Sequence, residues 1–299
     1  MQFIIYLKPL VSFERHRTTL FPDWAKAQNG FLRSKISVGL IDEDGKDFIK
    51  IDFADKYIGG YTLGTGLVQE EILFITAPEH IVAMLIVEKL EDDECLIMTG
   101  CEKFSSYSGY SKSFKFKGNY IDKSSRDKLD RKHIQWVAMD AQSYHTNPEL
   151  QFEAKNIIRD LNKSYCAFSA SKTNQSAIVT GNWGCGIFQG NVHLKVNYYT
   201  SDYTGTFNIL TTPLFFQFII QMLSAAMAHR DLLYLTFDDK KLSDELRKIN
   251  SKLKSRTVSE VYKIIISYND YLDAEADHEE FTFYDFFQKQ TSFSHCPLQ

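Results

Sequence analysis

Short apolar runs alternate with longer amphipathic stretches along most of this chain. The strand-like runs cover 48–53, 95–100, 136–141, 176–180 and 232–237, and the helix-like stretches cover 67–90, 149–167, 215–229 and 242–271. Continuous or period-two apolar runs are typical of strands, and apolar residues three and four apart are typical of helices. The alternation therefore predicts an α/β fold, a mixed sheet with helices on both faces. Pro78 should divide the first helical stretch into two helices.

The composition limits the classes of function. With 299 residues, of which 44% are hydrophobic, the chain can form one large domain or two modest ones. Its formal net charge is −4 and its basic residues are scattered, so we expect no direct binding of duplex nucleic acid. No apolar stretch reaches the roughly 20 residues that span a bilayer, so we expect no membrane partner.

The cysteines and the N-terminus bear on compartment and metal. The five cysteines have no CxxC spacing and no histidine at zinc-ligand spacing, so we expect no metal and no cofactor. The apolar start at 3–7 is too short for a secretory signal. We expect an intracellular protein, located in the nucleus or the cytoplasm.

Two glycine-rich segments mark the candidate site. Gly59-Gly60 precedes Gln69-Glu70-Glu71, and 181–186 holds three further glycines. Glycine lets backbone N–H groups approach anionic oxygens closely, and an acid at the next helix start can transfer a proton. Ligands of α/β sheets bind beyond the strand ends, where both segments fall. The pattern predicts chemistry on a phosphate-bearing sugar, although a Glu pair by itself is more simply a solvated helix surface.

Several blocks together resemble one family. They are Asp52-Phe53-Ala54, Gly59-Gly60, Leu67–Ile72, Glu94–Gly100, Tyr107–Tyr110, Thr180–Gly186 and Tyr234–Phe237. In composition and order they resemble the poly(ADP-ribose) glycohydrolases, from about Phe21 to Tyr271. The resemblance implies a macrodomain-like fold with an ADP-ribose site. It implies three regions: an irregular N-terminal segment 1–45 left from an accessory region, a glycohydrolase core 46–272 with an insertion near 198–212, and a peripheral C-terminal tail 273–299.

The resemblance also implies a reaction, the hydrolysis of ribose–ribose O-glycosidic bonds in poly(ADP-ribose) with release of ADP-ribose. Neighbouring helix residues point about 100° apart, so the two glutamates must divide the work, and the resemblance assigns the role of general acid and base to Glu71. Glu70 would bind ribose hydroxyls and help to keep Glu71 protonated. Gln69 would position the site. The partner is the polymer or ADP-ribose on modified proteins, the protein is a monomer, and the context is reversal of ADP-ribosylation in the DNA damage response.

The remaining predicted site residues bind substrate. By resemblance, Ile41 and Asp42 read the adenine edge, Tyr110 lies over the diphosphate, Asn182 contacts the distal ribose, Phe188 flanks the scissile ribose and Phe237 stacks on the adenine. Backbone donors near the glycine loops would hold the phosphates. The predicted binding set is completed by Asp52, Asp55, Gly59, Gly60, Gln69, Gly184, Cys185 and Gly186.

Two residues depart from the family signature. Tyr61 takes the place of a third glycine, and Asp55 takes the place of an asparagine. A tyrosine with positive φ would cost roughly 1–2 kcal/mol of strain, and its ring would have to leave or fill the site. The alternative function is therefore a protein that binds ADP-ribose or its polymer without cleaving it. The lysines between Lys112 and Lys132 fit either a surface that follows the polymer or a solvated excursion.

Overall fold

A computed structural model describes residues 2–5, 10–144, 146–171, 176–186, 212–274 and 283–292. The chain divides into two compact units, each assembled from segments that are distant in sequence. The first unit comprises Met1–Phe21, Gly39–Ala141 and Asn162–Thr180, and the second comprises Pro22–Val38, Gln142–Leu161 and Gly181–Gln299. Each unit is described separately below.

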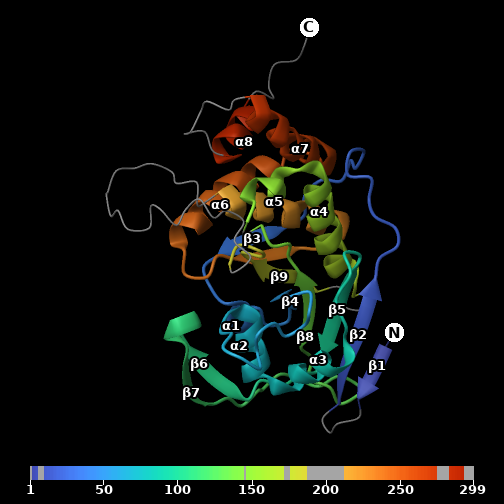
Figure 1. Ribbon diagram of the computed structural model, residues 1–299, viewed down its shortest axis with the longest axis vertical. Coiled ribbons are helices and arrows are strands. Elements are labelled where there is room, and N and C mark those ends of the chain that lie inside the picture. Colours follow the sequence, from blue (N-terminus) through green and yellow to red (C-terminus); the bar gives the residue numbers. More distant parts are fainter. Residues whose placement is uncertain are drawn as a thin grey trace. The chain divides into compact units, whose positions relative to one another are not determined.

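The first unit is built on a mixed sheet (Figure 1). Its strands follow the order β1 (Gln2–Ile5), β2 (Val11–Arg17), β5 (Glu94–Thr99), β8 (Gln135–Asp140), β4 (Ile49–Ala54) and β9 (Ile178–Gly181). The pairs β4–β8 and β4–β9 are parallel, whereas β5 runs antiparallel to β2 and β8. The central strands β5, β8 and β4 are almost entirely buried, which explains the continuous apolar runs in β5 and β8, whereas β4 also buries the polar Lys50 and Asp52.

Short helices and a hairpin accompany this sheet. They are α1 (Ile41–Asp44), α2 (Gln69–Thr76), the 3₁₀ turns η1 (Pro78–Val82) and η2 (Ser111–Ser113), α3 (Ala83–Ile86), and the strands β6 (Ser105–Ser108) and β7 (Lys115–Asn119). The predicted break at Pro78 is confirmed, because α2 ends at Thr76 and Pro78 opens η1. Proline fits the first position of a helical turn, where its missing N–H needs no partner.

The N-terminal region is not irregular as expected. Residues Val11–Arg17 form β2, whose Val11 and Phe13 are buried against the sheet. Only two apolar residues alternate before the polar Glu14 and Arg15, so the period-two signal is too short to recognise. Pairing with β5 decides the structure here, and Arg15 reinforces it through an ion pair with the partly buried Glu94.

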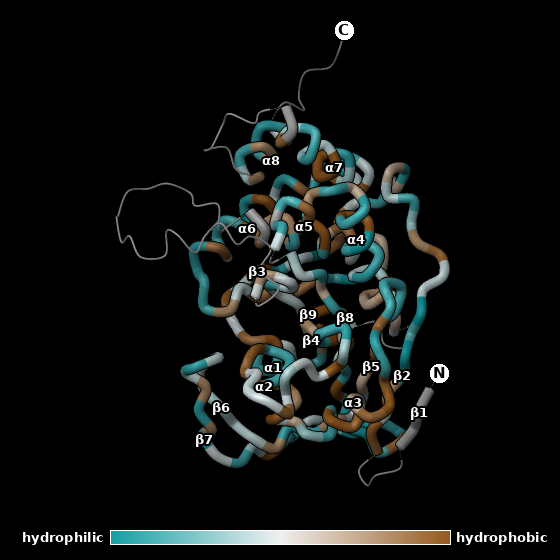
Figure 2. Tube along the Cα trace, viewed as in Figure 1, coloured by the Kyte–Doolittle hydropathy of each residue, from teal (hydrophilic) through white to brown (hydrophobic). Residues whose placement is uncertain are grey.

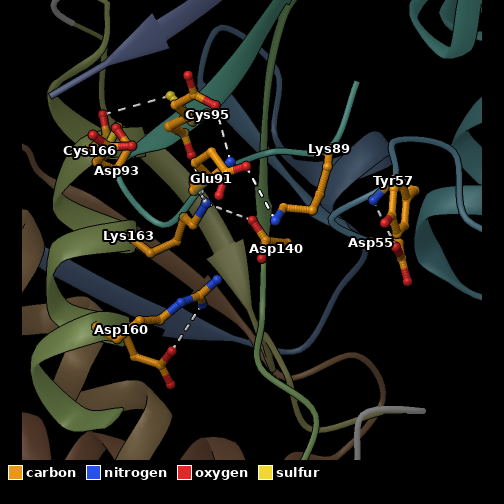
Figure 3. Close-up of polar contacts among 12 residues, drawn as sticks. Asp55, Tyr57, Lys89, Glu91, Asp93, Cys95, Asp140, Asp160, Lys163 and Cys166 are labelled. Carbon is orange, nitrogen blue, oxygen red and sulfur yellow. Dashed lines mark hydrogen bonds and ion pairs between the residues drawn. The ribbon is translucent and has the colours of Figure 1, made fainter. Parts of the chain in front are cut away.

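A buried ion pair joins a helix to the sheet of the first unit. In α4 (Ala154–Ser169), the ammonium group of Lys163 lies 2.6 Å from Oδ1 of Asp140 at the end of β8 (Figure 3). The same ammonium donates to the backbone oxygens of Glu91 and Glu94, at 2.6 and 2.8 Å. These bonds compensate for removing the charge from water, which would otherwise cost several kcal/mol per ion.

The second unit holds a parallel pair of strands, β10 (Leu232–Leu235) and β3 (Ser34–Ser37), and most of the remaining helices. They are η3 (Pro148–Phe152), α5 (Thr212–Met227), α6 (Lys240–Leu253), α7 (Val258–Ala274) and α8 (Phe283–Ser292). Helix α5 is mostly apolar and buried, whereas α6 has both hydrophilic and hydrophobic residues along its length (Figure 2) and buries Leu242, Leu246 and Ile249 among others. Among the described residues, no helix combines the length and apolar content needed to cross a membrane.

The expected peripheral tail contains part of this core. Phe283 and Phe287 of α8 are fully buried, and the Phe283 ring packs edge-on against Phe216 and Tyr268 at 5.1 and 4.9 Å. The prediction of a peripheral tail is thus wrong for Phe283–Ser292. The acidic residues that precede α8 made the whole tail look polar, so the apolar residues at helical spacing within α8 were not recognised.

Candidate active site

The site in the first unit is organised around the start of α2. Glu71 accepts a hydrogen bond from the backbone N–H of Val68 at 2.9 Å, which satisfies one of the free donors at the helix N-terminus. Valine offers no side-chain acceptor in return, so the cap depends on Glu71 alone. The helix start thereby fixes the position of this carboxyl group.

Gln69 joins α2 to strand β4. Its side-chain oxygen accepts from the Phe53 backbone N–H at 2.8 Å, and its side-chain nitrogen donates to the Ile51 carbonyl at 3.2 Å. Strand β9 pairs with β4 only at Ile49 and Lys50. Beyond these residues, the amide group of Gln69 makes the hydrogen bonds to the β4 backbone that a neighbouring strand would otherwise make. This geometry is that of a positioning residue, and direct substrate binding by Gln69 stays a prediction.

Glu70 is buried and holds the loop that follows β4. Its Oε2 accepts from the Asp55 backbone N–H at 2.9 Å, and its Oε1 accepts from the Gly59 backbone N–H at 2.6 Å. Burial raises the pKa of Glu70 well above its usual value, the nearby Asp52 raises it further, and the two backbone hydrogen bonds oppose the rise.

Glycines make room for the two carboxyl groups. A Cβ at position 60 would lie 2.7 Å from Oε1 of Glu71 and 2.9 Å from Oε2 of Glu70, and Gly60 has a φ of +48°. A Cβ at position 66 would lie 2.7 Å from both Cγ and Cδ of Glu71. The sequence reasoning missed Gly66, although its place three residues before Gln69 could have drawn attention to it.

Asp52 completes a cluster of three carboxyl groups. Its side chain is 0% exposed, and neither oxygen has a hydrogen-bond partner among the described residues. Burial raises the pKa of Asp52 well above its usual value, and the charge of Glu71 adds to the rise. With the pKa values of Asp52 and Glu70 both raised, the cluster retains a proton at a pH where ordinary carboxyl groups have lost it.

Both departures from the signature have local explanations. Oδ1 of Asp55 accepts the backbone N–H of Tyr57 at 2.8 Å (Figure 3), a turn bond that asparagine could make equally well. Tyr61 does not have a positive φ, and its side chain is 76% exposed. The condition for backbone strain at Tyr61, a positive φ, is therefore not met; the positive φ values belong to Gly59 and Gly60. Tyr61 contributes its backbone N–H, which donates to Oε1 of Glu71 at 3.1 Å.

Tyr110 belongs to the same place in the first unit. A hydrogen bond from the backbone of Gln69 reaches its hydroxyl group, whose pKa is raised by burial and, less strongly, by the charge of Glu71. Thus Tyr110 lies at the start of α2, beside the carboxyl cluster.

The predicted adenine-edge residues lie on α1. Ile41 is buried, and Asp42 accepts from the ammonium group of Lys103 at 2.7 Å and from the hydroxyl of Tyr107 at 3.1 Å. Since Lys103 neutralises the Asp42 carboxylate, an adenine amino group would have to share its oxygens. Adenine reading by these residues stays a prediction.

The second glycine loop belongs to the second unit. Oδ1 of Asn182 accepts the hydroxyl of Tyr234 at 3.2 Å, and the Cys185 thiol donates to the Trp183 carbonyl at 3.4 Å. Burial raises the pKa of Cys185 to about 12, so its thiol stays neutral. Gly184 has a φ of +73°, a backbone conformation that favours glycine. A Cβ added at Gly186 would have no atom within 4 Å.

Phe237, just beyond β10, is an unusual residue in the second unit. Its φ is +61° and its side chain is 40% exposed. Positive φ is rare for a bulky residue, and such strain persists mainly at functional sites. The predicted stacking ring is therefore accessible, while its role stays a prediction. Phe188, and the insertion near 198–212 except Thr212, lie outside the described residues.

The structure thus brings the predicted residues together in separate sets. Within the first unit, the residues gathered around the start of α2 are Asp52, Asp55, Gly59, Gly60, Gln69, Glu70, Glu71 and Tyr110. Within the second unit, Asn182, Gly184, Cys185 and Gly186 share one loop. In the described part of the chain, no three His, Cys, Asp or Glu side chains are grouped in a way that could hold a metal ion.

The mixed α/β fold and the carboxylate-bearing helix beside β4 define a macro domain. Residues 21–197 match the family described as poly (ADP-ribose) glycohydrolase, macro domain fold. The chain belongs to the poly(ADP-ribose) glycohydrolase family, which confirms the predicted family and fold class.

Curated relatives agree with this assignment. The chain is 40% identical to poly(ADP-ribose) glycohydrolase 1 of Arabidopsis thaliana over 164 residues, which is 53% of this chain and 29% of the relative. It is 32% identical to poly(ADP-ribose) glycohydrolase 1 of Caenorhabditis elegans over 244 residues, which is 76% of this chain and 28% of the relative. A third relative, poly(ADP-ribose) glycohydrolase 2 of Caenorhabditis elegans, is 30% identical over 221 residues, 70% of this chain and 41% of the relative. The chain therefore spans well under half the length of these proteins.

Proposed function

We propose that this chain hydrolyses the ribose–ribose O-glycosidic bonds of poly(ADP-ribose) and releases ADP-ribose. The observation that carries the proposal is the placement of Glu71. Its carboxyl group is held at the start of α2 by backbone N–H groups of Tyr61 and Val68, at 3.1 and 2.9 Å, within a cluster that retains a proton. Family membership and relatives with this activity in their names support the same substrate.

The proposed reaction uses Glu71 twice. As an acid it donates a proton to the departing ribose oxygen, and as a carboxylate it then takes a proton from the water that attacks the oxocarbenium-like carbon. A well-placed general acid is worth about 10²- to 10⁴-fold in rate, so much of the acceleration must come from rigid placement of the substrate. The backbone N–H groups of Gly59 and Gly60 already donate to Glu70 and to the Tyr57 carbonyl, so the backbone donors for that placement must come from other residues of the glycine loops.

The proposed role of Glu70 is to bind ribose hydroxyls. Each of its oxygens accepts one backbone N–H, and each carboxylate oxygen has a second lone pair for a sugar hydroxyl. The same two hydrogen bonds keep Glu70 from rotating toward the position of Glu71. The two glutamates thus have different tasks because their side chains are held by different partners.

The direct test is incubation of the protein with purified poly(ADP-ribose) and chromatographic measurement of free ADP-ribose. We expect monomeric ADP-ribose to accumulate with time and with enzyme concentration. Tight binding of ADP-ribose without release from the polymer would reject the hydrolase and establish the alternative, a binding protein. Absence of both activities would reject both functions.

A further inference from the structure

The hairpin β6–β7 carries unpaired positive charge on an acidic protein. Residues 111–121 contain three lysines and no aspartate or glutamate, whereas the whole chain has a formal charge of −4. Lys112, Lys115 and Lys117 are exposed, and none of them forms an ion pair with any residue that the structure describes. By contrast, Lys103 and Lys132, at the base of this excursion, are paired with acidic side chains.

Exposed apolar rings lie among these lysines. Phe116 is 62% exposed and Tyr120 is 40% exposed, and the ammonium group of Lys103 lies over the Tyr120 ring, 5.2 Å from its centroid, so Phe116 offers the more accessible flat surface. The mixture of hydrophobic and hydrophilic residues along β7 is visible in Figure 2. Positive groups interleaved with accessible aromatic rings are the combination that proteins use to bind single-stranded polyanions whose bases can stack.

The turn of the hairpin, η2 between β6 and β7, lies at the candidate active site. The backbone N–H of Ser111 donates to the carbonyl of Leu67 at 2.9 Å, two residues before α2 begins. Tyr110, next to it, is hydrogen-bonded by the backbone of Gln69. From this turn the five residues of β7 extend over roughly 17 Å toward the base of the hairpin. A chain cleaved at Glu71 can therefore continue onto the hairpin.

We infer that the hairpin β6–β7 binds the part of poly(ADP-ribose) that lies beyond the cleaved unit. This inference rests on the proposed function and adds a second subsite to it. The lysine ammonium groups attract the diphosphates, and Phe116 and Tyr120 stack against adenines of the polymer. Single-stranded nucleic acid offers similar groups, but only a substrate that also occupies the Glu71 site benefits from the position of the hairpin turn.

The test compares two triple variants with the same change in net charge. One carries Lys112→Gln, Lys115→Gln and Lys117→Gln. The control carries Lys240→Gln, Lys248→Gln and Lys254→Gln, at three exposed lysines of the second unit. Both are made with Glu71→Gln, so that the polymer stays intact, and binding of long poly(ADP-ribose), of ADP-ribose and of single-stranded RNA is titrated at several salt concentrations.

We expect the hairpin variant to bind long polymer about tenfold more weakly and ADP-ribose unchanged. Its plot of log K against log salt should be less steep by about 2, since each lost phosphate contact on a single strand contributes roughly 0.7. The single variant Phe116→Ala should also weaken polymer binding, by roughly five- to a hundredfold, without changing the salt dependence. The control triple should stay within about twofold of its parent.

Three results would overturn the inference: equal losses in both triples, an equal loss for ADP-ribose, or weakened binding of single-stranded RNA with polymer binding intact. Failure of the wild-type protein to release ADP-ribose would overturn the proposed function instead, and the polymer titrations would still decide the hairpin.

Discussion

Gly66 lies directly against the side chain of Glu71, so that a Cβ at position 66 would stand 2.7 Å from the carboxyl carbon. Real Cβ atoms do not approach this closely, and the neighbour must move if the glycine is replaced. Gly66 does not have a positive φ, so space, and not backbone conformation, is what position 66 requires. The proposed catalytic carboxyl group of Glu71 thus occupies space that is available only because residue 66 has no side chain.

Gly66→Ala should displace the Glu71 carboxyl and lower kcat by roughly 10²-fold, because a shift of about 1 Å at a reacting group can cost that much. Gly64→Ala is the matched control, since its Cβ would meet Tyr61 Cδ1 at an ordinary 3.4 Å. Steady-state rates of ADP-ribose release from both variants provide the comparison. Equal activity in the two would show that the space beside Glu71 is not needed.

Glu71→Gln should abolish proton transfer while keeping the shape of the side chain. We expect a loss of about 10²- to 10⁴-fold in kcat, with ADP-ribose affinity retained. Glu88→Gln, at an exposed glutamate, controls for the loss of one charge. A kcat of the Glu71→Gln variant equal to that of the wild type would show that Glu71 is not the general acid and base.

Asp52→Asn should change how stability depends on pH. Burial raises the pKa of Asp52 above 3.8, so the folded protein retains a proton that the unfolded chain releases. The contribution of Asp52 to stability is therefore complete below about pH 4 and is lost as the pH rises toward the folded value. Asparagine does not titrate, so the variant should gain in free energy of unfolding relative to wild type as the pH increases.

Urea unfolding between pH 4 and 8 measures this difference for Asp52→Asn. Asp47→Asn, at an exposed side chain, is the comparison. A constant difference between Asp52→Asn and wild type across the pH range would contradict a retained proton on Asp52.

Tyr61→Gly should leave turnover within about twofold of wild type. The Tyr61 ring is exposed and its backbone is unstrained, and the bond to Glu71 comes from the backbone N–H, which glycine also has. The added flexibility should cost roughly 0.5–1 kcal/mol of stability, visible as a small decrease in Tm. A large rise in kcat would show instead that the ring obstructs the substrate.

Local patterns were enough to predict most elements of the fold. Apolar runs located the buried strands at 95–100 and 136–141, because a strand buried on both faces needs consecutive apolar residues. One proline located the break at Pro78, because proline lacks the N–H that a continuing helix requires. Strand β2 and helix α8 could not be located in this way. The structure of β2 depends on pairing with β5, and that of α8 depends on packing against the aromatic core around Tyr268. Both partners are distant in the sequence.

The sequence by itself determined the family, the α/β class and the identity of the paired glutamates, since these reside in residue types and short spacings. The tertiary structure alone decided that Glu70 is bound by the Asp55 and Gly59 backbone, that buried Asp52 has no hydrogen-bond partner in the described part of the chain, and that the Tyr61 ring is exposed. Hydrogen bonding and desolvation depend on which groups lie next to one another in the folded protein. The separation of two residues along the chain does not determine whether they become neighbours.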